Sequence, residues 1–177
     1  MNYTTLALTA CTALSLISCG EKETADTDSP PTSGDGLESI IVTSEPAGAK
    51  SITEVRKAVE VGKEVTLAGK VMGRKDPFID GRALLMLGDP AKITSCDLMP
   101  GDSCVTPWDV CCDDNDVIKA STATIQVVDA DGKLIKQGLK GVNGIKELSQ
   151  LVITGTIAEG SNADNLLINA TAIFVKQ

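Results

Sequence analysis

The sequence predicts an all-β domain with short helices, arranged as a small five-stranded Greek-key barrel. Five segments between residues 65 and 175 have strand patterning, and one short helical candidate lies between the third and fourth of them. Gly69 and Gly73 suit a long first strand that bends sharply to serve both halves of a barrel. An antiparallel β-sandwich is the alternative arrangement for the same strands.

The composition excludes several classes of function. The chain has 177 residues, enough for one modest domain and an appendage, and 16 basic against 24 acidic residues give a net charge of −8. This balance disfavours a partner that is captured mainly through phosphate attraction. The chain has no histidine, so every Ser-His, Cys-His and His-metal mechanism is excluded. With no nucleophile or phosphate-loop motif either, we predict no catalytic residues, no enzyme activity and no cofactor.

A short helix is predicted ahead of the first strand. Ser51 and Glu54 have the spacing of a capping box, and Gly62 is a plausible stop. The apolar residues between these signals share one helical face: Ile52, Val55 and Val59.

The five strands follow in order, separated by turn signals. They are predicted over residues 65–71, 82–87, 123–128, 151–157 and 166–175. The second ends at Gly88-Asp89-Pro90, and the third at the turn sequence of residues 129–132. Between the third and fourth strands, residues 141–150 form the helical candidate, with Asn143 as its cap and Ile145 and Leu148 facing inward.

Five strands with a helix between the third and fourth is the order of the OB-fold, a small Greek-key barrel. The runs VGKEVTLAGKVMGRKDPF, TATIQVVDADGKL and LVITGTIAEG…LLINATAIFV resemble the bacterial exported OB-fold proteins that are related to anticodon-binding-type, nucleic-acid-binding-like domains. The resemblance covers roughly residues 52–177 and rests on pattern. It implies a ligand face across the second and third strands and their flanking loops.

A small basic lip is the candidate binding face. Residues 50–92 carry nine basic and six acidic residues, and the lip consists of Arg74, Lys75, Phe78 and Arg82. Base stacking needs aromatic rings on the face, and a single Phe beside a basic turn is more often a packing residue. Nucleic-acid binding is therefore disfavoured, and weak oligonucleotide binding on the barrel face is kept as an alternative function.

The N-terminus indicates where the protein is located. Residues 1–18 contain no charged side chain, and the segment Leu16-Ile17-Ser18-Cys19-Gly20 resembles the bacterial lipoprotein signal, although residues 1–5 lack Lys and Arg. The resemblance implies that Cys19 becomes the first mature residue and anchors the protein to a bacterial membrane on its extracytoplasmic side. An ordinary secretory signal cleaved near Ser18, or a buried helix, is the alternative.

The remaining chain divides into a tether and a domain. Residues 19–39 are acidic and rich in Ser, Thr, Pro and Gly, so they are predicted to be a flexible tether. Residues 40–177 form the OB-fold-like domain, with a Cys-rich insertion at residues 92–120 between the second and third strands. This insertion contains Cys96, Cys104, Cys111 and Cys112, and six acidic residues lie between positions 93 and 118 with no basic residue.

Three kinds of site suit the insertion. Two disulfides are favoured, because four thiols are left in an oxidising compartment once Cys11 is removed and Cys19 is lipidated. Trp108 would then pack over the sulfur atoms. The alternatives are a four-thiolate metal or cluster site, whose Cys spacing matches poorly, and calcium held by the aspartates.

These observations predict a non-catalytic binding or scaffolding lipoprotein. Its partners are the membrane, through the lipid on Cys19, and either another envelope protein or a small ligand on the barrel. A metal- or redox-handling protein that uses the four cysteines is the alternative from a different class.

Overall fold

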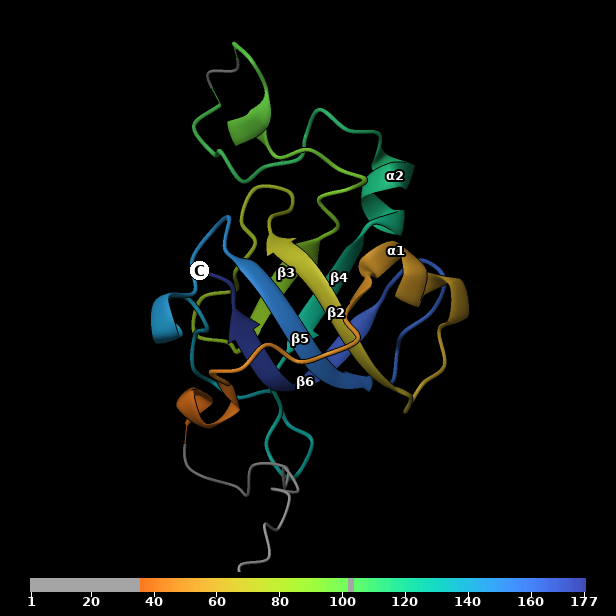
Figure 1. Ribbon diagram of the computed structural model, residues 1–177, viewed down its shortest axis with the longest axis vertical. Coiled ribbons are helices and arrows are strands. Elements are labelled where there is room, and N and C mark those ends of the chain that lie inside the picture. Colours follow the sequence, from red (N-terminus) through yellow and green to blue (C-terminus); the bar gives the residue numbers. More distant parts are fainter. Residues whose placement is uncertain (1–35, 102–103) are drawn as a thin grey trace, which may run out of the picture.

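A computed structural model describes residues 36–101 and 104–177, and its main feature is a closed β-barrel (Figure 1). Five strands form the barrel: β2 (Glu64–Val71), β3 (Leu84–Gly88), β4 (Thr122–Gln126), β5 (Gln150–Ile157) and β6 (Leu167–Val175). Neighbouring strands follow the order β2-β3-β4-β6-β5, and β5 pairs with β2 to close the ring. Only the β4–β6 pair is parallel among these. The predicted OB-like barrel is therefore confirmed, since a sandwich of two separate sheets would leave this ring open.

The ladders around the barrel differ in length. β2 pairs with β5 over seven positions, from Glu64 opposite Thr156 to Lys70 opposite Gln150. The β2–β3 ladder has only two pairs, at Lys70 and Val71. The short strand β1 (Lys50–Ser51) lies outside the barrel and pairs in parallel with the middle of β2. It covers part of the β2 edge that β3 leaves unpaired.

The barrel core is built from the inward-facing residues of all five strands. Leu67, Leu85, Ile125, Ile153 and Ile168 each have 0% of their surface exposed. Successive side chains of a strand alternate between its two faces, so apolar residues two positions apart reach the same interior. Gly69 allows β2 to approach β3, because a Cβ at this position would lie 2.7 Å from the Leu87 side chain.

The first predicted helix is present and short. It consists of α1 (Ile52–Val55), which continues into the 3₁₀ turn η2 (Arg56–Ala58). Its capping box is confirmed: the Glu54 amide donates to Ser51 Oγ at 3.2 Å, and the Ser51 amide donates to Glu54 Oε2 at 3.0 Å. These bonds satisfy amide groups that a helix start otherwise leaves without partners.

The second predicted helix, over residues 141–150, is wrong. Only the 3₁₀ turn η4 (Val142–Gly144) forms there. Asn143 and Leu148 have positive φ angles of 46° and 68°, which interrupt a right-handed helix. Ile145 is fully buried as predicted, whereas Leu148 is half-buried and the Asn143 side chain makes no cap bond.

The packed domain begins slightly before the predicted boundary at residue 40. The turn η1 (Leu37–Ile40) places Leu37 in the barrel core with 0% of its surface exposed. The predicted signal peptide, Cys19 and residues 19–35 of the predicted tether lie outside the described residues. Within the described part of the chain, no helix has the length and apolar character needed to cross a membrane.

Candidate functional site

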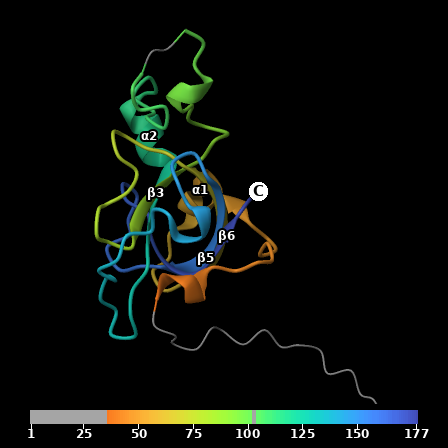
Figure 2. The same cartoon turned by 90° about the vertical axis from the view of Figure 1, so that its left-hand side faces the viewer.

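The predicted Cys-rich insertion projects from one end of the barrel (Figures 1 and 2). We call residues 92–120 the cysteine loop. It follows β3 and returns to β4, and it contains the turn η3 (Cys96–Leu98) and the helix α2 (Asn115–Ala120). The Asp89 amide donates to the Ser121 carbonyl at 2.8 Å, so the two ends of the loop are joined at its base.

A second, small apolar core lies beneath the cysteine loop. It consists of the buried residues Met72, Ile93, Val110 and Ile118 and is separate from the barrel core. Met72 belongs to the β2–β3 connection, whereas the other three belong to the loop. The loop is therefore anchored to the barrel by burial of apolar side chains as well as by its covalent ends.

Backbone hydrogen bonds hold the two arms of the cysteine loop side by side. The Cys96 amide donates to the Asp109 carbonyl at 2.9 Å, and the Asp97 amide donates to the Pro107 carbonyl at 2.8 Å. The Thr94 amide donates to the Asp113 carboxylate at 2.7 Å. Cys96 on one arm is thereby fixed next to Cys111 on the other.

Three of the four predicted site cysteines meet in this loop. The sulfur atoms of Cys96, Cys104 and Cys111 all lie within 4.8 Å of one another, and those of Cys96 and Cys111 are 3.9 Å apart. Cys96 is buried, Cys104 is half-buried and Cys111 is exposed, so the sulfur cluster opens on one side to solvent. Cys112 is exposed and lies outside this group. We call Cys96, Cys104 and Cys111 the sulfur cluster.

The two predicted disulfides are not formed among these four cysteines. No pair of their sulfur atoms is at bonding distance, which for a disulfide is about 2.05 Å. The backbone has nevertheless brought together the thiols that the sequence separates by up to 15 positions. The arrangement therefore presents thiol groups that can bind an ion jointly or be oxidised pairwise.

The surroundings of Cys111 shift the pKa of its thiol in opposing directions. A hydrogen bond with Cys96 lowers the pKa of the Cys111 thiol, but desolvation, the Cys112 thiol and the charge of Asp109 raise it, and the net change is upward. Reactive redox thiols have lowered pKa values, because the thiolate is the nucleophile. Cys111 is therefore not activated as a nucleophile by its surroundings.

A buried lysine of the barrel holds the arm of the cysteine loop that carries Cys96. Lys70, on β2, is 9% exposed, and its Nζ donates to Ser95 Oγ at 2.8 Å and to the Asp97 carboxylate at 3.2 Å. Ser95 Oγ in turn donates to Asp97. These contacts tie the start of η3 to the barrel wall and neutralise one of the loop's acidic side chains.

Asp109 and Trp108 join the other arm to the β2–β3 connection. The Lys75 amide donates to Asp109 Oδ2 at 3.1 Å, while Asp109 Oδ1 is buried without a hydrogen-bond partner among the described residues. The indole N–H of Trp108 donates to the Lys75 carbonyl at 2.8 Å. The indole N–H of Trp108 is thus bonded to the β2–β3 connection. Packing of the Trp108 ring over the sulfur atoms stays a prediction.

The four residues of the predicted basic lip have different environments. Phe78 lies in the barrel core with 5% of its surface exposed, so its ring is not available to stack on a base. Arg74 bonds to Asn115 of α2, and the Lys75 backbone bonds to Trp108 and Asp109. Arg82 is exposed in the turn before β3. Two of the four lip residues therefore bind to the cysteine loop itself.

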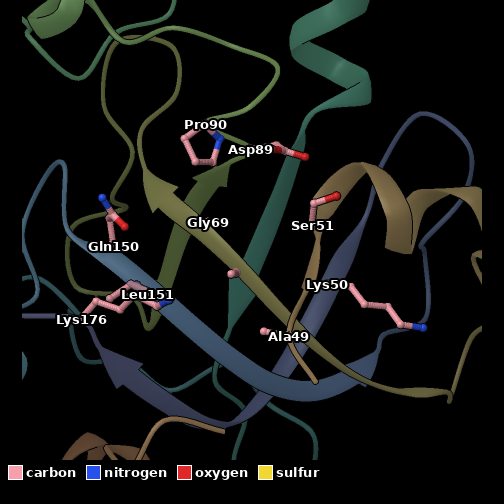
Figure 3. A pocket seen from close by; sticks show the side chains of 10 residues that line it. Ala49, Lys50, Ser51, Gly69, Asp89, Pro90, Gln150, Leu151 and Lys176 are labelled. Atoms are coloured by element: carbon pink, nitrogen blue, oxygen red, sulfur yellow. The ribbon is translucent and has the colours of Figure 1, made fainter. Parts of the chain in front are cut away.

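A shallow pocket lies on the outer face of β2, near Gly69 and Asp89 (Figure 3). Its volume of about 190 Å³ is below the range of about 300–1,000 Å³ that is usual for small-molecule sites. The Asp89 carboxylate at its edge is already bonded to the Thr53 hydroxyl at 2.8 Å and to the Ala91 amide at 3.1 Å. The small volume of the pocket and the existing bonds of Asp89 make it a weaker candidate site than the cysteine loop.

Sequence reasoning identified the cysteines but missed Lys70, Ser95 and the unpaired oxygen of Asp109. Lys70 lies in a strand where alternation indicates an exposed side chain, and its burial depends on the loop that folds over it. Comparison of the chain with protein-family models, curated proteins and solved structures finds no match.

Proposed function

We propose that the protein is a lipid-anchored, extracytoplasmic, non-catalytic binding protein that presents the cysteine loop as its binding element. One observation carries the choice of the cysteine loop: the thiol groups of buried Cys96, half-buried Cys104 and exposed Cys111 converge within 4.8 Å in a loop that has its own small core. The barrel is the scaffold that holds the loop, and the N-terminal segment through Cys19 attaches the scaffold to the membrane.

The residue content of the chain favours binding over catalysis. The chain contains no imidazole that could act as a base to activate a thiol or hydroxyl nucleophile. The barrel face is the weaker candidate, because Phe78 is buried and Arg74 is engaged by Asn115.

Membrane fractionation of cells that express the full chain tests the anchor. The wild-type protein is expected in the membrane fraction, with its loop thiols labelled in spheroplasts by a membrane-impermeant maleimide. Cys19→Ser should accumulate as an unprocessed or unlipidated form. Unchanged membrane retention and mobility of Cys19→Ser would contradict lipid attachment, and thiols protected until lysis would contradict an extracytoplasmic location.

A binding assay with a fluorescent single-stranded dT oligonucleotide tests whether the binding element is the cysteine loop or the barrel face. At low salt, the purified chain is expected to show no saturable binding. Saturable, salt-sensitive binding that is lost in the double variant Arg74→Ala/Arg82→Ala would move the binding element to the barrel face.

A further inference from the structure

The sulfur cluster has the spacing of ligands around one metal ion. Zinc–sulfur bonds are about 2.3 Å long, so two thiolates at the corners of a tetrahedron lie about 3.8 Å apart. The observed Cys96–Cys111 separation of 3.9 Å matches this value closely. Cys104, whose sulfur lies within 4.8 Å of the others, needs to approach by at most about 1 Å.

This spacing is set by the backbone. The two amide-to-carbonyl bonds from Cys96 and Asp97 to the opposite arm fix the positions from which the sulfur atoms project. The buried contact of Lys70 with Ser95 fixes the same arm against the barrel. Cys96 and Cys111 are therefore already in place and only Cys104 has to move when an ion binds, which limits the conformational entropy lost on binding.

Charge and softness define the class of ligand. Six acidic residues and no basic residue lie between positions 93 and 118, so the loop attracts cations. Asp109 adds a buried carboxylate oxygen without a partner on the arm that carries Cys111. Sulfur ligands select thiophilic ions such as zinc over magnesium or calcium, which prefer oxygen.

We infer that Cys96, Cys104 and Cys111 form a three-thiolate zinc site with a fourth coordination position open to solvent. Three protein ligands and one open position distinguish such a site from a closed structural site with four. Cys111 is the exposed member of the three, so its side of the sulfur cluster is where solvent can reach the ion. This inference rests on the proposed function, because it names the ligand class of the same loop.

Metal titration of the full chain, purified from membranes under anaerobic reducing conditions, tests the site. Zn²⁺ in competition with a chromophoric chelator is expected to bind at one ion per chain. Co²⁺ as a spectroscopic probe should give a thiolate-to-cobalt charge-transfer band with the intensity of three thiolates. Zinc should displace the cobalt and remove the band.

Single Cys→Ser variants identify the ligands. Cys96→Ser, Cys104→Ser and Cys111→Ser should each weaken zinc binding at least 100-fold, since loss of a ligand exceeds the about 10–100-fold cost of losing a supporting contact. Cys112→Ser is the matched control, because this residue adjoins Cys111 and lies outside the sulfur cluster. The zinc affinity of Cys112→Ser should change less than threefold. A loss of zinc affinity in Cys112→Ser as large as in the other three variants would make Cys112 a fourth ligand and overturn the open coordination position.

The intact mass of protein purified without reductant decides between metal and disulfides. A mass lower by two or four hydrogens, with no bound zinc and no zinc uptake after reduction, would overturn the zinc site. This outcome would leave the lipid anchor untouched, because anchoring is measured separately with Cys19→Ser. Conversely, unchanged retention of Cys19→Ser would contradict the anchor and not the metal site.

Discussion

The barrel and the cysteine loop bury very different amounts of apolar side chain. The barrel core contains 21 buried hydrophobic residues of the described chain, whereas the core beneath the loop contains four. The barrel strands are joined by five ladders that close on themselves. The arms of the loop, by contrast, are joined by separate backbone bonds and by side chains such as Lys70 and Asp113.

From this difference we infer that the barrel supplies the global stability and that the loop can open by itself. Segments with few buried apolar contacts open locally, at a lower free energy than the whole domain. Binding of an ion at the sulfur cluster would stabilise the closed form of the loop by mass action. Substitutions in the barrel should therefore lower the stability of the whole domain, whereas substitutions in the loop should act on the loop alone.

The barrel core should be the most sensitive region. Leu85, on β3, is fully buried in the barrel, and Leu85→Ala removes three carbon atoms and leaves a cavity. We expect the free energy of unfolding to fall by about 3 kcal/mol in urea denaturation of the reduced, metal-free chain. A loss below about 1 kcal/mol would show that the barrel is not the stable unit.

The bulge between β5 and β6 should also tolerate no added atom. A Cβ at Gly155 would lie 2.3 Å from the Asn169 carbonyl oxygen, which belongs to the backbone and cannot rotate away. Gly155→Ala should cost about 2 kcal/mol of unfolding free energy, as overpacking in a closed site does. Gly138→Ala is the control, because its nearest atom would be 3.9 Å away. Equal effects of the two variants would contradict this steric explanation.

The core beneath the cysteine loop should respond locally. Val110 is fully buried there, and Val110→Ala should cost about 1–2 kcal/mol through lost burial. Because the loop opens by itself, this cost should appear as faster hydrogen exchange of the Cys96 and Asp97 amides, which bond to the opposite arm. The amides of β5 should keep their exchange rates. Faster exchange throughout β5 would mean that loop and barrel unfold as one unit.

The barrel could be predicted from the sequence more completely than the connections between its strands. The barrel followed from local patterns, since alternating residues such as Val65, Leu67 and Val71 and the capping box at Ser51 are signals within a few positions. The prediction of a short helix at 141–150 was wrong, because Asn143 and Leu148 adopt positive φ angles that the apolar pattern does not reveal. The Leu148 amide donates to the Val71 carbonyl on β2 at 2.8 Å, and this tertiary contact overrides local propensity.

The candidate site was predictable in composition and not in geometry. Four cysteines in an acidic insertion marked the loop, but which sulfur atoms meet depends on the pairing of Cys96 with Asp109 across the loop. The burial of Lys70 and the engagement of Arg74 by Asn115 depend on the same fold of the loop. Such contacts join residues that are distant in sequence, and no local pattern records them.

The two helix caps extend the comparison to smaller effects. Ser51 caps α1 against the barrel, and Asp114 caps α2 in the loop by accepting from the Asp116 amide at 2.9 Å. Each substitution by Ala removes one cap bond, which is worth about 1 kcal/mol. Ser51→Ala should lower the global unfolding free energy by this amount, and Asp114→Ala should instead speed exchange in α2. If both variants lowered the global unfolding free energy equally, the loop could not open independently of the barrel.

The smallest expected effect is the pH dependence of the α1 cap. Hydrogen bonds from the backbone and side chain of Ser51 lower the pKa of Glu54. A carboxyl group whose folded pKa is lowered contributes stability above its unfolded pKa, and this contribution is lost as the pH falls through the folded value. Urea denaturation between about pH 5 and pH 3 should therefore show a small loss in the wild type. Glu54→Gln keeps an oxygen acceptor but cannot titrate, so its loss over this range should be smaller; an equal loss would assign the acid sensitivity to other carboxylates.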